Sequence, residues 1–185
     1  MGRLIYLMGA SGVGKDCLLQ AARRAHPEWL VAHRYLTRES SATEDCVALS
    51  DAEFSVRSEL GMLCLAWQAH GLKYGVGVEV EAWLGRGTTV LLNGSRRALP
   101  MALERFGDAL VPVVITAPPD VLRRRLIARG RESIDEIEHR LKRHQEMERE
   151  LMDAFPGVAR VNNGGRLADS LTELAAVIKG CSALA

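Results

Sequence analysis

The chain has 185 residues, of which 48% are hydrophobic, and its formal net charge is +1. This length and composition predict one domain with a sizeable core. They exclude a membrane span, because no apolar run approaches about 18 residues, and near-neutrality argues against general affinity for nucleic acids or membranes. The four cysteines are far apart and form no CxxC pair, which favours ordinary intracellular thiols over disulfides or a metal cluster. Because no secretory pattern opens the sequence, we expect a cytoplasmic protein.

The first half of the chain alternates apolar, strand-like runs with helical segments. The predicted elements are, in order, a strand at 4–8, a helix at 14–26, an extended segment at 29–38, a strand at 46–49, a helix at 51–57, a strand at 62–69 and a helix at 78–84. Two further segments, 39–45 and 70–77, are expected to be loops, because polar residues or glycines interrupt the pattern there.

The second half continues the alternation with longer helices. The predicted elements are a strand at 88–92, a helix at 96–106, a strand at 110–116, a helix at 118–129, a long polar helix at 134–155, a strand at 158–161 and a helix at 167–179. Alternating strands and helices of these lengths predict an α/β fold with a mainly parallel central sheet flanked by helices. Since no linker interrupts the pattern, we expect a single domain over residues 1–185.

A glycine-rich segment follows the first predicted strand and precedes the first predicted helix, the context that a phosphate-binding P-loop requires. Its glycines allow successive backbone N–H groups to point at an anion, and the start of the helix adds partial positive charge. The lysine can reach the β- and γ-phosphates of ATP. The predicted nucleotide-binding residues are Gly9, Ala10, Ser11, Gly12, Val13, Gly14, Lys15 and Asp16.

The residue after the P-loop lysine departs from the usual pattern. A Ser or Thr normally stands there and contacts Mg²⁺, whereas this chain has Asp16. A carboxylate is also a hard oxygen ligand, so we expect Asp16 to bind Mg²⁺. The alternative is that Asp16 only favours the first turn of the helix.

Two segments in the first half of the chain are candidates for binding a second substrate. Arg34 and Arg38 are four residues apart on extended chain, so they share a face and can hold a phosphate. The alternative is a solvated basic edge. Tyr74 and Gly75 belong to a glycine-rich segment that a small ligand can approach closely. The alternative there is a turn with a packed aromatic ring.

The strand at 88–92 is followed by Asn93, where P-loop enzymes often have an acidic metal-binding residue. An amide can donate and accept hydrogen bonds but supplies no charge to a metal. We therefore infer that the ligand charge has moved to Asp16, and we expect Asn93, Ser95 and Arg96 to contact the substrate.

Arginines are concentrated between residues 123 and 143 of this nearly neutral chain. Arg in a closing lid can stabilise the charge that spreads over a transferred phosphoryl group. We expect Arg129 and Arg140 to act in this way. For Arg123, Arg124 and Arg143 we favour the alternative of ion pairs on the surface, because acidic residues lie nearby in the sequence.

The order of these segments resembles the guanylate kinase superfamily across nearly the whole chain. The resemblance implies a P-loop NTPase fold, with a small acceptor-binding region at about 34–78 and an arginine-rich lid at about 125–145. It also implies that Lys15, Arg129 and Arg140 are catalytic. The implied acceptor-binding residues are Arg34, Thr37, Arg38, Glu44, Tyr74, Gly75, Asn93, Ser95 and Arg96.

Two departures argue against GMP as the acceptor. Ser41 stands where guanylate kinases have a second arginine, and Leu65 stands where they have the glutamate that reads guanine. A leucine accepts no hydrogen bonds, and each buried unpaired donor of the base costs about 1–3 kcal/mol.

Longer matches, including residues 31–38, 70–79, 92–96 and 129–132, are similar to the family of ribose 1,5-bisphosphate phosphokinases. That resemblance implies ATP-dependent formation of 5-phospho-α-D-ribose 1-diphosphate in phosphonate degradation, with ATP and Mg²⁺ as cofactors and a phosphosugar as substrate. The alternatives are a guanylate kinase and a binding module of the same fold that has lost kinase activity. The oligomeric state stays open, a homodimer included.

Overall fold

The structure is a computed structural model that describes residues 2–38, 46–69, 71–130 and 132–182. The described chain divides into two compact units, each formed by two stretches of sequence. The first unit comprises Met1–Tyr6 and Leu19–Val111, and the second comprises Leu7–Leu18 and Pro112–Ala185. None of the described helices combines the length and the hydropathy that a bilayer-spanning helix needs.

Parallel strands form a five-stranded sheet in the order β2-β7-β1-β8-β9. Its strands are β1 (Arg3–Met8), β2 (Leu30–Ala32), β7 (Thr89–Asn93), β8 (Leu110–Thr116) and β9 (Ala159–Asn162). Side chains of β1, including Ile5 and Leu7, are fully buried, as a strand covered on both faces requires. The predicted parallel sheet is therefore confirmed.

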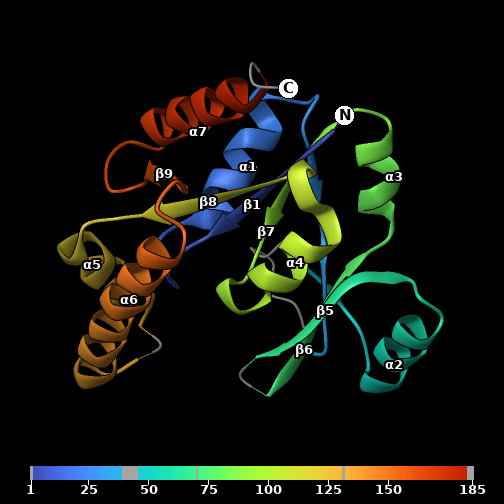
Figure 1. The fold of residues 1–185 in the computed structure, drawn as a ribbon. Coiled ribbons are helices and arrows are strands. Elements are labelled where there is room, and N and C mark those ends of the chain that lie inside the picture. The colour runs from blue at the N-terminus through green and yellow to red at the C-terminus, as the bar shows by residue number, and fades with distance from the viewer. Residues whose placement is uncertain (1, 39–45, 70, 131, 183–185) are drawn as a thin grey trace. The chain divides into compact units, whose positions relative to one another are not determined.

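The second unit also contains helices. They are α5 (Pro119–Arg129), α6 (Ile134–Ala154) and α7 (Leu167–Ser182), and α1 (Lys15–Ala25) begins in this unit (Figure 1). The first two lie side by side and bury Leu126 and Ile137. Gly130 ends α5 in the left-handed conformation, with φ 66°. Ser133 and Glu136 form a capping box that starts α6.

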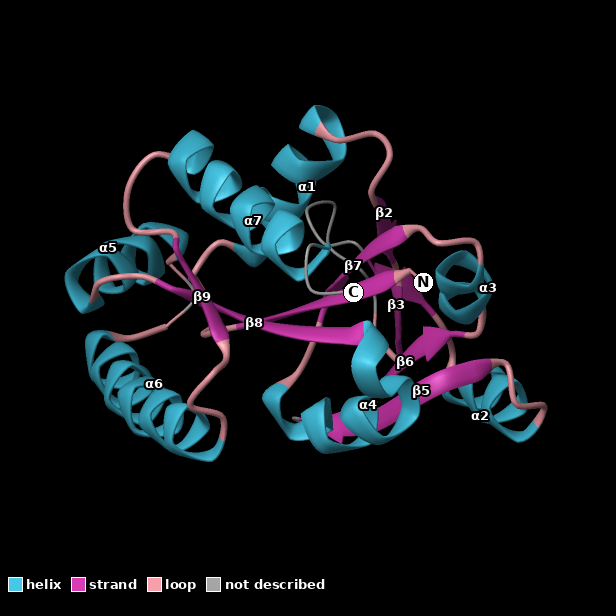
Figure 2. Ribbon diagram, turned by 45° about the horizontal axis from the view of Figure 1, so that its top comes forward, coloured by secondary structure: helices cyan, strands magenta, loops and turns pink. Residues whose placement is uncertain are grey.

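The first unit contains a second sheet of four strands, in the order β4-β3-β6-β5 (Figure 2). These strands are β3 (Arg34–Leu36), β4 (Cys46–Ala48), β5 (Leu63–Ala69) and β6 (Leu72–Gly77). β6 pairs antiparallel with both β3 and β5, whereas β3 and β4 are parallel. The helical elements of this unit are α2 (Asp51–Glu59), α3 (Glu79–Gly85), η1 (Arg96–Ala98), α4 (Leu99–Phe106) and η2 (Gly107–Ala109).

The prediction of a loop at 70–77 was wrong, since residues 72–77 form β6. Gly75 lies inside the strand, opposite Tyr35 on one side and Ala66 on the other. A Cβ atom there would lie 2.9 Å from the Leu63 side chain and 3.2 Å from the Phe54 ring. Glycine therefore allows α2 and β5 to pack closely against this strand, and it is not a strand breaker here.

Candidate active site

The P-loop occupies residues 9–16, between the end of β1 and the first turn of α1. Gly12 and Gly14 have φ angles of 85° and 91°, which favour glycine over any residue with a side chain. A Cβ atom at Gly14 would lie 2.5 Å from the Asn163 amide nitrogen. Glycine at this position is therefore required both by backbone conformation and by space.

Lys15 folds back over the loop that precedes it. Its Nζ donates hydrogen bonds to the carbonyl oxygens of Gly9, at 2.8 Å, and Ala10, at 3.1 Å. The ammonium group thus lies at the loop itself, where the phosphates of a nucleotide bind in P-loop proteins. Asp16 follows in the first turn of α1 and is half-exposed.

Two residues from distant parts of the sequence support the P-loop. The Val13 carbonyl oxygen accepts hydrogen bonds from Asn163 Nδ2, at 2.8 Å, and from Arg125 Nη1, at 3.0 Å. Arg125 Nη2 also donates to the Asn163 carbonyl at 2.8 Å, and Ser170 Oγ of α7 donates to Asn163 Oδ1 at 2.8 Å. Asn163 is only 3% exposed. The P-loop backbone is therefore tied to α5, to the turn after β9 and to α7.

Asn163 lies between the strand predicted at 158–161 and the helix predicted at 167–179, and its contacts with the P-loop were not predicted from the sequence. The residue directly follows β9, the last strand in the order of the parallel sheet, at the carboxyl edge where ligands bind in open α/β sheets. That position is the signal that could have identified it.

The arginines of α5 and α6 divide into two groups. Arg123 and Arg124 form exposed ion pairs, with Glu138 at 2.7 Å and with Asp120 at 3.2 Å, as the surface interpretation expects. Arg129 instead donates from Nη1 to Ser11 Oγ of the P-loop, at 3.3 Å. Arg129 therefore extends from the end of α5 to the nucleotide-binding loop.

Arg129 and Arg140 also share one carboxylate. Arg129 Nη2 donates to Glu132 Oε1, and Arg140 Nη1 lies 3.2 Å from the same oxygen. Two of the predicted catalytic residues are thus brought together within the second unit.

The first unit contains the predicted acceptor-binding residues that follow β7. Tyr6 of β1 is fully buried, and its hydroxyl donates to the Ser95 carbonyl and accepts from the Ser95 N–H, both at 2.9 Å. Burial raises the pKa of Tyr6 to about 12. A Cβ atom at Gly94 would collide with the Tyr6 ring. Tyr6 therefore fixes the segment that carries Asn93 and Arg96. This role was not predicted, because Tyr6 stands in an apolar run of the sequence.

Arg34 and Tyr74 lie together on the four-stranded sheet. The Arg34 guanidinium carbon is 6.0 Å from the centre of the Tyr74 ring, and Tyr74 stacks on Trp67 with ring centres 5.4 Å apart. The buried Arg34 Nε has no hydrogen-bond partner among the residues that the structure describes. An arginine held in this way can still offer donors to an anionic ligand.

The other residues of this predicted group lie close to β6 or outside the described chain. Thr37 Oγ1 accepts from the Lys73 N–H at 3.0 Å, next to Tyr74. Arg38 is exposed at the last described position before residues 39–45. Glu44 and Ser41 belong to that segment and lie outside the described residues. Leu65 is only 1% exposed and packs in the core.

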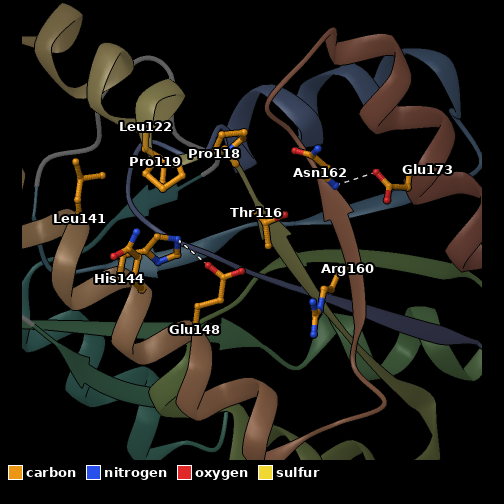
Figure 3. A pocket seen from close by; sticks show the side chains of 12 residues that line it. Thr116, Pro118, Pro119, Leu122, Leu141, His144, Glu148, Arg160, Asn162 and Glu173 are labelled. Carbon is orange, nitrogen blue, oxygen red and sulfur yellow. Dashed lines mark hydrogen bonds and ion pairs between the residues drawn. The ribbon is translucent and has the colours of Figure 1, made fainter.

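A pocket of about 450 Å³ lies elsewhere in the second unit (Figure 3). Pro119, Leu122 and Leu141 line one side of it, and His144 Nε2 lies 3.2 Å from Glu148 Oε2. It contains none of the residues predicted to bind nucleotide or acceptor. The candidate nucleotide-binding and acceptor-binding residues therefore lie outside this pocket.

The P-loop, the parallel sheet and the arginines of α5 and α6 define a phosphotransferase of the P-loop class with a guanylate kinase-like fold. Two solved structures support the fold. Guanylate kinase from Anaplasma phagocytophilum matches with a TM-score of 0.71 and 18% identity, over 97% of this chain and 85% of that chain. A gluconokinase from Sinorhizobium meliloti 1021 matches with a TM-score of 0.52 and 16% identity, over 99% of this chain and 95% of that chain.

Sequence identity to curated relatives identifies the family of this chain. The ribose 1,5-bisphosphate phosphokinase PhnN of Pectobacterium parmentieri is 43% identical over 188 residues, 99% of this chain and 98% of that protein. The protein of the same name from Yersinia pestis is 46% identical over 94% of this chain and 90% of its own length. The one from Burkholderia pseudomallei is 46% identical over 96% of this chain and 96% of its own length. No protein-family model matches the chain. The chain belongs to the family of ribose 1,5-bisphosphate phosphokinases PhnN.

Proposed function

We propose that this protein uses ATP to phosphorylate ribose 1,5-bisphosphate and forms 5-phospho-α-D-ribose 1-diphosphate, in phosphonate degradation. The observation that carries the proposal is 43–46% identity to phosphokinases of that name along nearly the whole chain. The intact P-loop with Lys15 supports a working kinase over a binding module of the same fold that has lost activity.

The second unit would bind the phosphates of ATP. Backbone N–H groups of the P-loop and the start of α1 would hold the β- and γ-phosphates, with Lys15 as a mobile point charge. Arg129 and Arg140 would neutralise charge on the transferred phosphoryl group. Arg129 already extends to Ser11 of the loop, which supports this assignment.

Asp16 would hold Mg²⁺. When this ion binds together with ATP, it neutralises part of the negative charge of the β- and γ-phosphates. Within the described part of the chain, no three or more His, Cys, Asp or Glu side chains gather into a group that could hold a metal. This fits Mg²⁺, because in kinases the ion takes most of its ligands from phosphates and water and needs only one or two carboxylates. Asp16 lies in the first turn of α1, directly after the P-loop lysine, which supports this part of the proposal.

The first unit would bind the acceptor. The two phosphates of ribose 1,5-bisphosphate can accept hydrogen bonds from the arginines and hydroxyl groups among the predicted acceptor-binding residues. Of these residues, Arg34, Tyr74 and Ser95 are held by contacts with their neighbours. The nucleophile is an oxygen of the 1-phosphate, which is already an anion at neutral pH. The protein therefore needs no general base, and its task is to position two polyanions and reduce their repulsion.

The proposal is tested by mixing the purified protein with ribose 1,5-bisphosphate, ATP and Mg²⁺. We expect ADP to form in step with loss of the acceptor, and ³¹P NMR to show a new diphosphate on the sugar. The Lys15→Ala variant serves as the inactive control. ADP release without consumption of the acceptor would contradict the proposal.

A further inference from the structure

Glu132 occupies an unusual place for an acidic residue, next to the arginines that are proposed to contact ATP. Its side chain is 8% exposed, and one oxygen, Oε1, is shared by Arg129 and Arg140. Arg129 also donates to Ser11 of the P-loop. A single buried carboxylate thus connects an arginine at the end of α5, an arginine of α6 and the nucleotide-binding loop.

Two capped helix ends lie close to Glu132 in the sequence. Gly130 caps α5 in the left-handed conformation, and its N–H bonds to the carbonyls of Leu126 and Ile127. Ser133 caps α6, and its N–H is bound by Glu136 Oε2 at 2.8 Å. Glu132 directly precedes Ser133, so the start of α6 fixes its backbone on that side.

Two guanidinium groups that approach the same point repel each other unless an anion lies between them. Glu132 provides that anion while occupying only one nitrogen of each arginine. Arg129 Nε and Glu132 Oε2 are buried and make no hydrogen bond within the described chain. An arginine has five N–H donors, so both side chains retain donors for phosphate oxygens.

We infer that Glu132 is the positioning residue that holds Arg129 and Arg140 together for the γ-phosphate of ATP. This inference rests on the proposed kinase function and adds a residue to it. Glu132 acts through the two arginines and does not touch the substrate itself. Its carboxylate is what allows two positive charges to converge beside the P-loop before the nucleotide arrives.

A second ion pair between the same helices supplies the matched control. Arg123 and Glu138 join α5 to α6 at 2.7 Å, but both side chains are about half exposed and neither contacts the P-loop in the described structure. A merely structural role for Glu132 predicts that Glu132→Gln and Glu138→Gln have similar effects. A positioning role predicts that only Glu132→Gln changes the recognition of the γ-phosphate.

The first measurement compares the binding of ADP with that of AMP-PNP, a non-hydrolysable ATP analogue, by calorimetry. We expect the preference for AMP-PNP over ADP to fall at least about tenfold in Glu132→Gln and to be unchanged in Glu138→Gln. Glu132→Asp keeps the charge on a shorter side chain and should recover part of the preference. A Glu132→Gln protein that keeps the wild-type preference overturns the inference, whatever its melting temperature.

The second measurement places Glu132→Gln in an Arg140→Ala background and follows kcat and KM for ATP. Because Glu132 acts through the arginines, its substitution should reduce kcat less in that background than in the wild type. Equal reductions in both backgrounds overturn the inference. Wild-type protein that binds AMP-PNP but does not phosphorylate ribose 1,5-bisphosphate refutes the acceptor assignment alone, and the binding comparison then decides the role of Glu132. Wild-type protein that does not bind AMP-PNP refutes both proposals.

Discussion

Asp16 is the residue at which this P-loop departs from the common pattern, and its carboxylate is testable as a Mg²⁺ ligand. Asp16→Asn keeps the size of the side chain and removes its charge. We expect it to weaken the apparent affinity for Mg²⁺ in the ATP complex by roughly tenfold, while the affinity for ATP at saturating Mg²⁺ changes less. The measurement is the rate of phosphosugar phosphorylation against free Mg²⁺.

Two further substitutions control this experiment. Asp16→Ser restores the hydroxyl of the common P-loop and should be milder than Asp16→Ala. If wild type and all three variants show the same dependence on Mg²⁺, Asp16 is only a residue that favours the start of α1.

Tyr6 gives a prediction about pH. Its pKa in the folded protein is about 12, above the ordinary value of 10.0, because burial disfavours the charged form and outweighs the hydrogen bond to Ser95. The folded protein therefore keeps the proton over a range where the unfolded chain loses it. The stability that this proton contributes is fully present below about pH 10 and is lost as pH rises toward 12.

The measurement is the free energy of unfolding in denaturant at pH 9 and pH 11 for wild type and Tyr6→Phe. At pH 9 the variant should be less stable by about 1–3 kcal/mol, because it leaves the polar groups of Ser95 without their partner. Between the two pH values, wild type should lose roughly 1 kcal/mol more than the variant. Equal losses would show that Tyr6 does not keep its proton over this range.

At the scale of elements, Asn163 connects the turn after β9 to the P-loop and to α7. Asn163→Ala removes the donor to the Val13 carbonyl and the acceptor for Ser170. Losing such buried hydrogen bonds costs about 1–3 kcal/mol. We expect a lower melting temperature and an affinity for AMP-PNP that is weaker by roughly tenfold, since the P-loop carbonyl is no longer held in place.

The neighbouring Asn162 is the control for this prediction. Its side chain accepts a hydrogen bond from the Gly164 N–H at 2.9 Å, within the turn, and forms no hydrogen bond with the P-loop in the described structure. Asn162→Ala should therefore leave the affinity for AMP-PNP close to the wild-type value. Equal effects of the two substitutions on binding would contradict a specific role for Asn163.

Elements that depend on local sequence signals were predictable, whereas those that depend on distant pairing were not. The helices of the second unit and strands β1, β7, β8 and β9 depend on local signals, such as the Ser133–Glu136 capping box for α6, and were predicted close to their observed bounds. The extended segment predicted at 29–38 was not resolved correctly, because it forms β2 of the parallel sheet and β3 of the other sheet. The four-stranded sheet depends on pairing between residues 34–36, 63–69 and 72–77, which no local pattern encodes. Glycine in β6 was read as a breaker because its packing against Leu63 and Phe54 cannot be seen in the sequence.

The site was predictable to a similar extent. The P-loop could be recognised in the sequence because its eight residues are contiguous. The contacts of Asn163 and Glu132 were not predicted, because they arise across the fold, with Val13 in the first case and with a pair of arginines in the second. Such contacts bring together residues up to 150 positions apart.

At the scale of the whole molecule, the assignment of roles follows the two units. The second unit contains the P-loop and the arginine pair, which we assign to ATP, and the first unit contains the predicted acceptor residues. Leu65 belongs to the core of the first unit, so Leu65→Glu would bury an unpaired carboxylate and destabilise the protein. Acceptor choice is therefore tested best with the wild-type protein.

The most direct test of the central claim is a competition between two acceptors. Wild-type protein receives equal concentrations of ribose 1,5-bisphosphate and GMP with limiting ATP and Mg²⁺, and both products are separated by ion-exchange chromatography. We expect the phosphosugar to be preferred in kcat/KM by at least about 30-fold, because guanine would leave two or more donors unpaired at about 1–3 kcal/mol each. Equal use of both acceptors, or a preference for GMP, would contradict the account.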